Sequence, residues 1–313
     1  MKNVLVTGGA GFIGSALIRA LLEEPGVERV VALDNLLTGY ERNLAEVKSR
    51  IEFHTADVRD LASLERLFAD MDVVFHQAAI PSVPRSIDDP QLTHEVNIGG
   101  TFNVLLAAQR RKVSRVVYAA SSSAYGDTEV LPKSETLAPQ PKSPYAVQKL
   151  VGEYYARTFF DNYGLDTVCL RYFNVFGPRQ DPASPYSGVI SLFCTAALGK
   201  QAPTIFGDGE LTRDFTYVDN IVQLNLLAAR SPKAPGNVYN GGVGARITLN
   251  ELWSKCQELE GLDLPPRYQP LRAGDVRDSQ ADLGAARRDL HYEPRIGLSE
   301  GLRRTLAWYR ASA

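Results

Sequence analysis

The sequence contains little cysteine. Three cysteines occur among the 313 residues, at Cys169, Cys194 and Cys256, with no CxxC pair and no histidine at metal-ligand spacing. This pattern argues against both a disulfide framework and a metal site. We therefore expect three reduced thiols in the core, no bound metal and a cytoplasmic protein.

Long hydrophobic runs and an excess of one sign of charge are also missing. No stretch reaches the ~20 apolar residues that a membrane span requires, and the segment Met1–Gly9 lacks the long apolar centre of a signal peptide. The net charge is −2, and the lysines and arginines are scattered along the chain. We expect neither membrane association nor a nucleic-acid partner.

The first half of the chain alternates short apolar segments with longer amphipathic segments. The segments with the β-branched character of buried strands are Val4–Val6, Val30–Leu33, Ile51–His54, Val73–His76 and Val116–Ala119. The amphipathic segments at 13–22 and 61–68 have the character of helices. This alternation predicts an α/β fold built on a doubly wound parallel sheet with helices on both faces.

The pattern changes after Arg171, where prolines divide the chain into shorter pieces. We expect residues 1–172 to form the sheet domain and residues 173–313 to form mainly a smaller C-terminal α/β lobe. Because residues 237–240 have the character of another strand, the chain is expected to rejoin the first domain over about 215–242.

A glycine-rich turn follows the first predicted strand and opens a helix. Its residues are Gly8, Gly11, Phe12, Ile13 and Gly14. The missing side chains allow a tight turn and a close approach of pyrophosphate to the helix N-terminus. Asp34 lies twenty residues after Gly14, where a carboxylate accepts hydrogen bonds from a ribose diol and repels a 2′-phosphate. This predicts NAD; the alternatives are a corner without a ligand, or NADP, because Arg42 is near.

The third and fourth predicted strands end in further candidate cofactor contacts. Asp57 and Val58 end the third strand, although Asp57 is equally suited to cap the helix that starts near Leu61. The residues that end the fourth strand are Gln77, Ala78 and Ala79. Their small size allows a ring to approach, and a tight packing corner is the alternative.

Tyr145 and Lys149 stand four residues apart behind Pro144, which is well placed to start a helix. This spacing puts both side chains on one helix face. An ammonium group there stabilises a phenolate, so we expect a lowered pKa for the tyrosine and a general base for a hydroxyl proton. A solvated helix face is the alternative.

A run of hydroxyls closes the strand before this helix. Its members are Ser121, Ser122 and Ser123. They stand at the carboxyl edge of the predicted sheet, where open α/β folds bind ligands. At least one is expected to be catalytic, and capping of the next turn is the alternative.

Several motifs together resemble those of the extended short-chain dehydrogenases that act on nucleotide sugars. They are TGGAGFIG, SSSAYGD, SPYAVQK, RYFNVFGPRQ, GDGELTRDFTYVDN and RAGDVRDSQAD. The closest pattern is that of UDP-N-acetylglucosamine 4-epimerases and, more broadly, UDP-glucose 4-epimerases. The resemblance covers nearly the whole chain and implies a Rossmann domain with NAD as cofactor and a UDP-sugar as substrate.

The resemblance also implies roles for residues on both sides of the site. Tyr145 would take the proton of the sugar 4-hydroxyl while hydride passes to NAD, and Lys149 would assist it. Ser122 is the favoured third member, with Ser121 and Ser123 as competitors. Further cofactor contacts would be Asn35, Tyr172 and Val175. The substrate contacts would be Ser82, Val83, Asn174, Gln180, Val189, Arg213, Arg272, Asp275 and Ser279, with the two arginines and Asn174 at the diphosphate and Asp275 at the uridine ribose.

Ser279 is the clearest clue to the sugar. Relatives confined to non-acetylated hexoses tend to have a tyrosine at this place, whereas serine leaves room for a 2-acetamido group, so UDP-GlcNAc and UDP-GalNAc are the expected substrates. The alternative is that Ser279 faces solvent and specificity is set elsewhere.

Other functions stay open at this point. A UDP-hexuronic acid would need a cation such as Arg85 for its carboxylate. A sugar-nucleotide 4,6-dehydratase needs an acid pair beside the active serine, and only Asp127 and Glu129 lie near in sequence. A non-enzymatic NAD sensor or scaffold is the remaining alternative.

Relatives pair two helices to form a homodimer, which we expect here for the helices at 145–162 and about 99–111. Their apolar stripes include Leu105, Val151, Tyr155 and Phe159. Burial in the core is the alternative explanation of these stripes.

Overall fold

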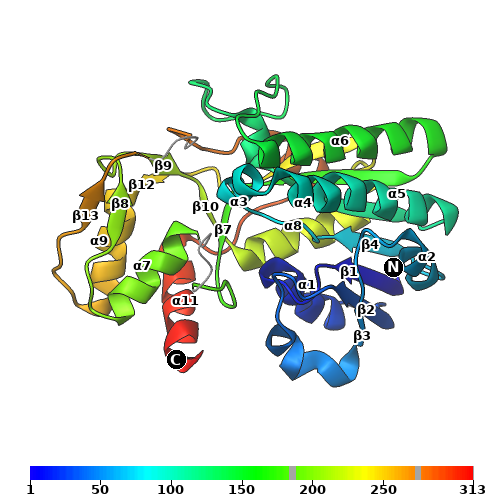
Figure 1. Ribbon diagram of the computed structural model, residues 1–313, viewed down its shortest axis with the longest axis horizontal. Helices are drawn as coiled ribbons and strands as arrows, with labels where there is room; N and C mark the ends of the chain where they lie inside the picture. Colours follow the sequence, from blue (N-terminus) through cyan, green and yellow to red (C-terminus); the bar gives the residue numbers. More distant parts are fainter. Residues whose placement is uncertain (183–187, 272–275, 313) are drawn as a thin grey trace.

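A seven-stranded parallel sheet runs between two layers of helices in the larger part of the molecule (Figure 1). The computed structural model describes residues 1–182, 188–271 and 276–312. The strand order is β11-β6-β5-β4-β1-β2-β3, and every neighbouring pair is parallel. The strands are β1 (Asn3–Thr7), β2 (Arg29–Asp34), β3 (Glu52–Thr55), β4 (Val73–His76), β5 (Arg115–Ser121), β6 (Asp166–Tyr172) and β11 (Asn237–Gly241). The predicted doubly wound parallel sheet is thereby confirmed.

The inner strands are apolar along almost their whole length because helices cover both faces. In β1 all residues after Asn3 are buried. Val4 pairs with Val30 of β2 and with Val73 of β4, so three predicted strands meet in one layer of the core.

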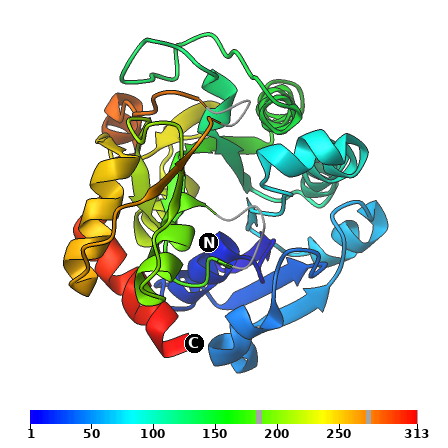
Figure 2. The same cartoon turned by 60° about the vertical axis from the view of Figure 1, so that its left-hand side comes forward.

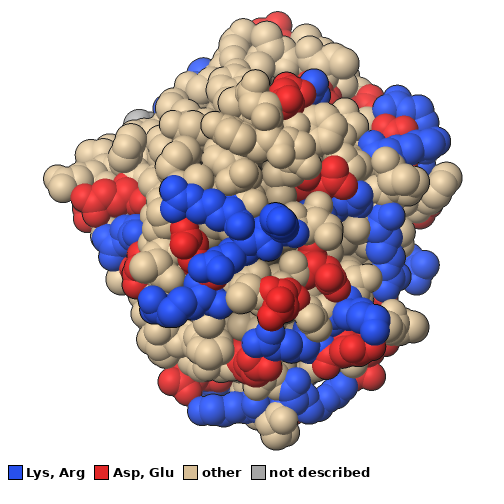
Figure 3. Space-filling model, turned by 90° about the vertical axis from the view of Figure 1, so that its right-hand side faces the viewer, with Lys and Arg blue, Asp and Glu red and all other residues tan. Residues whose placement is uncertain are grey.

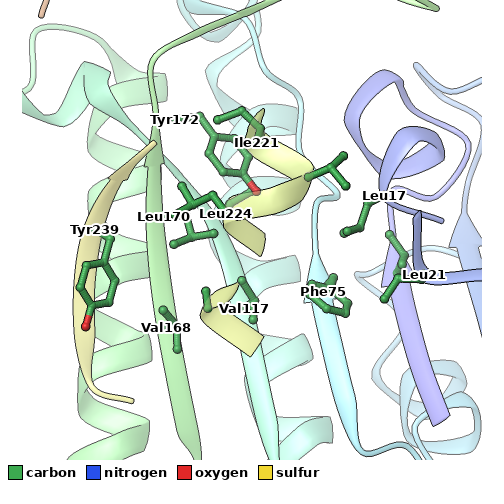
Figure 4. Close-up of a cluster of buried hydrophobic side chains, with 14 of the residues drawn as sticks. Leu17, Leu21, Phe75, Val117, Val168, Leu170, Tyr172, Ile221, Leu224 and Tyr239 are labelled. Atoms are coloured by element: carbon green, nitrogen blue, oxygen red, sulfur yellow. The ribbon is translucent and has the colours of Figure 1, made fainter. Parts of the chain in front are cut away.

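One face of the sheet is covered by two long helices, α1 (Phe12–Leu22) and α8 (Val218–Arg230). Leu17 and Leu21 of α1 point with Ile221 and Leu224 of α8 onto Phe75 and Val117 of the sheet (Figure 4). The 3-10 segment η1 (Glu41–Arg50) packs beside α1, and α10 (Gly284–Leu290) packs on β11. The sequence did not predict η1.

The opposite face is covered by α2 (Leu61–Leu67), α5 (Thr101–Arg110) and α6 (Pro144–Tyr163). Figure 1 shows α5 and α6 side by side along this face. Shorter elements lead into them, namely α3 (Val83–Asp88), α4 (Pro90–His94), the π-helical η2 (Glu95–Gly100) and the 3-10 turn η3 (Ser122–Tyr125). Ser143 caps α6 by accepting a hydrogen bond from the backbone N–H of Ala146.

The remaining elements form a second lobe beside the carboxyl ends of the strands (Figure 2). They are β7 (Asn174–Phe176), α7 (Val189–Leu198), β8 (Thr204–Phe206), β9 (Thr212–Arg213), β10 (Phe215–Tyr217), β12 (Ile247–Thr248), α9 (Leu249–Glu260), β13 (Arg267–Gln269) and α11 (Leu298–Ser312). The strands pair two by two, and α7, α9 and α11 enclose a separate core around Phe193, Trp253 and Leu302. Strand β11 joins the main sheet beside β6. The division at residue 172 stays a prediction.

The surface mixes charges of both signs. Figure 3 shows basic and acidic side chains lying next to one another on one face, and pairs such as Arg29–Glu52 and Arg110–Glu65 join them. The three cysteines are buried with free thiols. Among the described helices, none is long and apolar enough to cross a bilayer.

The apolar stripes of α5 and α6 divide between the core and the surface. Leu105 and Phe159 are buried in the core that packs on the sheet. Burial in the core, and not a dimer contact, therefore explains these two apolar residues. Val147, Tyr154 and Tyr155 instead lie on the outer face of α6, with exposed fractions of 44%, 59% and 36%.

We expect two chains to dimerise through this outer face of α6. A charge placed there would be buried without a partner on association, so Tyr154→Arg should raise the dimer dissociation constant at least ~10-fold. Sedimentation velocity measures this. Tyr268→Arg, at a 52% exposed tyrosine of β13, is the matched control and should leave the dimer intact. A monomeric wild-type chain would contradict the prediction.

Candidate active site

A cavity of about 610 Å³ opens at the carboxyl ends of β1, β2, β4, β5 and β6. Its other wall comes from the second lobe, through Asn174, Arg213 and Ser279. This is the edge of an open α/β sheet at which ligands bind. Nearly all of the predicted site residues that the structure describes line this one cavity.

The glycine turn forms the floor of the cavity at β1. Gly8 has φ +68°, and a Cβ on it would lie 2.7 Å from the backbone nitrogen of Ala78. A Cβ on Gly14 would lie 2.1 Å from the carbonyl oxygen of Gly8. The turn therefore requires glycine at both places. It brings the N-terminus of α1, with Phe12 and Ile13, into the cavity wall, where backbone N–H groups favour a phosphate.

Asp34 lies buried at the end of β2 and also lines the cavity. Its carboxylate accepts hydrogen bonds from the backbone N–H of Ala10 (3.0 Å) and of Leu36 (2.8 Å). Burial raises the pKa of Asp34, and these N–H donors oppose that shift. Arg42 lies over the ring of Tyr40 at 4.2 Å, outside the residues that line the cavity. The glycine turn and this carboxylate together fit an NAD molecule.

Of the two cofactor contacts predicted at the end of β3, one lines the cavity and the other does not. Val58 lines the cavity, as does Asn35, but the side chain of Asp57 does not. Asp57 pairs with Arg59 (2.9 Å) and accepts from Asn35 (2.9 Å), and the Arg59 guanidinium lowers the pKa of Asp57 to about 2. The alternative role of Asp57 as a helix cap is wrong, because Asp60 caps α2.

Gln77, Ala78 and Ala79 line the cavity at the end of β4. The amide nitrogen of Gln77 donates to the hydroxyl of Tyr172 (3.1 Å) and to Asn225 (3.1 Å). Tyr172 and Val175 line the same region. Side-chain hydrogen bonds of Gln77 thus connect the end of β4 to β6 and α8.

Tyr145 and Lys149 face the cavity from the first two turns of α6. The ammonium of Lys149 donates to the carbonyl oxygen of Ala119 at 2.7 Å. The side chain of Ser121, at the end of β5, interacts with the phenol of Tyr145 and lowers its pKa. A tyrosine, a serine hydroxyl and a buried ammonium thus meet where the glycine turn opens.

The pKa of Tyr145 lies opposite to the expected direction. Burial raises the pKa of Tyr145 to about 12, and the interaction with Ser121 opposes this shift. Burial lowers the pKa of Lys149 to about 7. The expected lowering by Lys149 fails in the polypeptide alone, because the ammonium points to Ala119 instead of the phenol.

The structure places Ser121, and not the favoured Ser122, against Tyr145. Ser121 also accepts from the hydroxyl of Ser123 (2.8 Å) and from its backbone N–H (3.2 Å). All three serines line the cavity. Ser121 is the last residue of β5, whereas Ser122 begins the following 3-10 turn, so the two side chains leave the strand end in different directions.

Most, but not all, of the predicted substrate contacts line the cavity. The described residues among them that line the cavity are Ser82, Val83, Asn174, Gln180, Arg213 and Ser279. Val189 does not line it and packs against the second core, next to the cavity residue Gly188. Arg272 and Asp275 lie outside the described residues. Ser279 is 6% exposed, so the alternative that it faces solvent is wrong.

Lys133 is a charged cavity residue that the sequence did not predict. Lys133 lines the cavity, is 1% exposed and donates to the carbonyl oxygen of Gly126 at 2.9 Å. Burial lowers the pKa of Lys133 to about 8. A single lysine in a loop carries no local signal of burial, because its surroundings include a backbone bridge to the distant residue Ala281.

Carboxylates are scarce in this cavity. Among the described residues that line it, they are Asp34 and Asp181. Asp127 instead accepts from the backbone N–H of Arg277 (3.1 Å) and pairs with Lys142 (3.3 Å). The acid pair that a 4,6-dehydratase needs is thus not found at the described serines.

Comparison with known proteins places this geometry in a family. The model of the NAD dependent epimerase/dehydratase family matches residues 4–242. A UDP-glucose 4-epimerase of Mycolicibacterium smegmatis is 39% identical over 313 residues, covering 98% of both chains.

Solved structures are similar over the whole chain. The UDP-N-acetylglucosamine 4-epimerase of Methanobrevibacter ruminantium, in complex with UDP-N-acetylmuramic acid, superposes with a TM-score of 0.95 at 38% identity and covers 100% of this chain and 99% of its own. A mutant of the UDP-glucuronic acid 4-epimerase of Bacillus cereus, with NAD and a fluorinated UDP-sugar, gives 0.92 at 33% identity, with full coverage of both chains.

Proposed function

This chain belongs to the NAD dependent epimerase/dehydratase family, and we propose that it is an NAD-dependent UDP-sugar 4-epimerase that interconverts UDP-GlcNAc and UDP-GalNAc. One observation carries the proposal: Tyr145 and Ser121 interact in the cavity that also holds the glycine turn and Asp34. A group that removes a hydroxyl proton therefore stands beside a site built for a dinucleotide.

The reaction divides between the cofactor and the side chains. NAD, when bound, takes up the hydride from C4 of the sugar and later returns it. Tyr145 takes the proton of the 4-hydroxyl, with Ser121 bridging the two oxygens, so the C4–H and O–H bonds break and a 4-keto sugar forms. The same tyrosine returns the proton after the hydride reaches the other face of C4. No atom is gained or lost.

Lys149 makes the tyrosine a competent base. Because burial holds the pKa of Tyr145 near 12, a positive charge close by is needed to stabilise its phenolate. Lys149 lies one helical turn away on the same face of α6 and is itself buried. Lys149 would hold the nicotinamide ribose of NAD, and its positive charge would stabilise the phenolate of Tyr145.

Inversion requires the keto sugar to turn over while its nucleotide stays bound. Arg213 and Asn174 line the second-lobe side of the cavity and suit the diphosphate, since a guanidinium presents paired donors to phosphate oxygens. We assign Arg272 to the same diphosphate and Asp275 to the uridine ribose. Ser82, Val83 and Gln180 are proposed to surround the turning sugar.

Ser279 supports an acetylated substrate. It lies in the cavity wall, where its backbone N–H donates to the carbonyl oxygen of Thr212 at 3.1 Å. A serine leaves space there that a tyrosine ring would fill.

A second candidate function, 4-epimerisation of a UDP-hexuronic acid, is favoured by one observation. Arg85 lines the cavity and offers a cation for a sugar carboxylate.

Conversion of UDP-GlcNAc to UDP-GalNAc tests the proposal. The purified chain with NAD should produce the 4-epimer, and Tyr145→Phe should lower kcat by at least ~100-fold, because the proton acceptor is lost. Proton NMR resolves the products from UDP-GlcNAc, UDP-Glc and UDP-GlcA in separate reactions. A product from UDP-GlcA alone would support the uronic acid function. No 4-epimer from any of the three, despite NAD binding, would leave a sensor or scaffold as the better account.

Alanine substitutions should separate the three serines. Ser121→Ala is expected to lower kcat by about 100-fold or more, since the bridging hydroxyl at Tyr145 is removed. Ser122→Ala, at the neighbouring cavity residue, should stay within about threefold of wild type. Initial rates with saturating sugar measure both. A large loss at Ser122 with little at Ser121 would return the role to Ser122.

A larger side chain at residue 279 should change the choice of sugar. Ser279→Tyr is expected to lower kcat/KM for UDP-GlcNAc at least ~10-fold while changing that for UDP-Glc much less, because the ring occupies the space proposed for the acetamido group. Ser279→Ala is the matched control and should retain both substrates. Equal losses on both sugars in Ser279→Tyr would contradict the assignment.

A further inference from the structure

Helix α6 carries a third buried polar side chain in line with the reactive pair. Glu153 follows Lys149 by four residues, as Lys149 follows Tyr145, so all three lie along one helix face. Glu153 forms a two-bond ion pair with Arg171 of β6, with Nε–Oε1 at 2.9 Å and Nη2–Oε2 at 2.7 Å. The side chains are 3% and 4% exposed.

Stability alone is a poor explanation for this buried pair. Removing two charges from water is costly, and replacing such a pair with apolar side chains is often neutral or stabilising. The pair is also incompletely satisfied, because Nη1 of Arg171 is buried without a hydrogen-bond partner among the described residues. Its guanidinium lies 4.5 Å from the ring centre of Tyr125.

The neighbours of Lys149 on the adjacent strands are neutral groups. The ammonium lies 2.7 Å from the carbonyl oxygen of Ala119 and 4.9 Å from the ring centre of Tyr118, both on β5. Behind Tyr118 stacks His76 of β4, whose pKa burial lowers to about 3, so the imidazole is neutral.

Strand β6 adds no other negative charge in this region. Burial raises the pKa of Cys169, which keeps its thiol neutral, and Arg171 is positive. Within the described part of the chain, Glu153 is the negative group that raises the pKa of Lys149 against the effect of burial.

We propose that Glu153 is a positioning residue of the active site: its carboxylate, held by Arg171, keeps the side chain of Lys149 charged where helix α6 meets the sheet. The inference rests on the proposed function at one point, the activation of Tyr145 by a charged Lys149. The interactions are electrostatic: the carboxylate of Glu153 stabilises the charged form of Lys149, and the charge of Lys149 stabilises the phenolate of Tyr145.

Titration of Lys149 itself is the direct test. In the full chain with NAD, NMR of 13C-labelled lysine side chains follows the ammonium, whose signal is assigned by its loss in Lys149→Met. Glu153→Gln should move the midpoint down by about one pH unit or more. Asp161→Asn, which breaks the exposed Arg157–Asp161 pair on the same helix, should leave the midpoint unchanged. An unchanged midpoint in Glu153→Gln would overturn the proposal.

A second variant distinguishes the proposed effect from misfolding and from a purely structural role of the ion pair. Glu153→Gln with Arg171→Met removes both charges and leaves no unpaired ion in the core. The midpoint should still fall, whereas a pair that only joins α6 to β6 predicts no change. Glu153→Asp keeps the charge and should restore the wild-type midpoint.

Activity gives a separate result. With UDP-GlcNAc at pH 7.5, Glu153→Gln should lose at least ~10-fold in kcat with KM within about threefold, since ground-state binding is untouched. A wild-type chain without epimerase activity would refute the proposed function, while the Lys149 midpoint would still decide the role of Glu153.

Discussion

The close approach of helix α6 to strand β5 is the contact on which the active site depends. A Cβ on Gly152 would lie 2.3 Å from the hydroxyl of Tyr118, so only glycine allows this separation. Because the helix lies so near, the ammonium of Lys149 reaches the carbonyl oxygen of Ala119 on the same strand. Tyr145, one turn earlier, is thereby held at the carboxyl end of the sheet, beside the glycine turn. The packing of a helix thus sets the position of a reactive group.

The opposite wall is built by different means. The described strands of the second lobe are short, and a buried carboxylate connects its segments. Asp214 accepts hydrogen bonds from the backbone N–H groups of Val243 (2.9 Å), Gly244 (2.9 Å) and Ala281 (3.1 Å). Ser279 lies two residues before Ala281 in the same segment. The wall proposed to face the sugar is therefore held by side-chain to backbone hydrogen bonds, a small number of which determine its shape.

Local constraints explain which features the sequence predicts. The turn at Gly14 is recognisable because a missing Cβ is a property of one residue and its neighbours, and the spacing of Tyr145 and Lys149 follows from helix geometry. The choice between Ser121 and Ser122 depends on where β5 ends relative to α6, which no local pattern specifies. Lys133 is buried only because its loop pairs with a segment nearly 150 residues later. For the same reason the pKa of Tyr145 was predicted in the wrong direction, since burial and the orientation of the lysine are tertiary properties.

The distribution of acids separates epimerisation from elimination. Loss of water from a 4-keto sugar needs a base for the C5 proton and an acid for the leaving hydroxyl, in addition to the tyrosine. Among the described cavity residues the carboxylates are Asp34, which accepts backbone hydrogen bonds after β2, and Asp181, which accepts from Tyr40 at 2.7 Å. Tyr40 belongs to the loop after β2, so both acids lie on the side of the cavity that the end of β2 forms. Because the described part of the cavity holds no carboxylate beyond these two, its side chains fit the proposed reversible exchange at C4 better than an elimination.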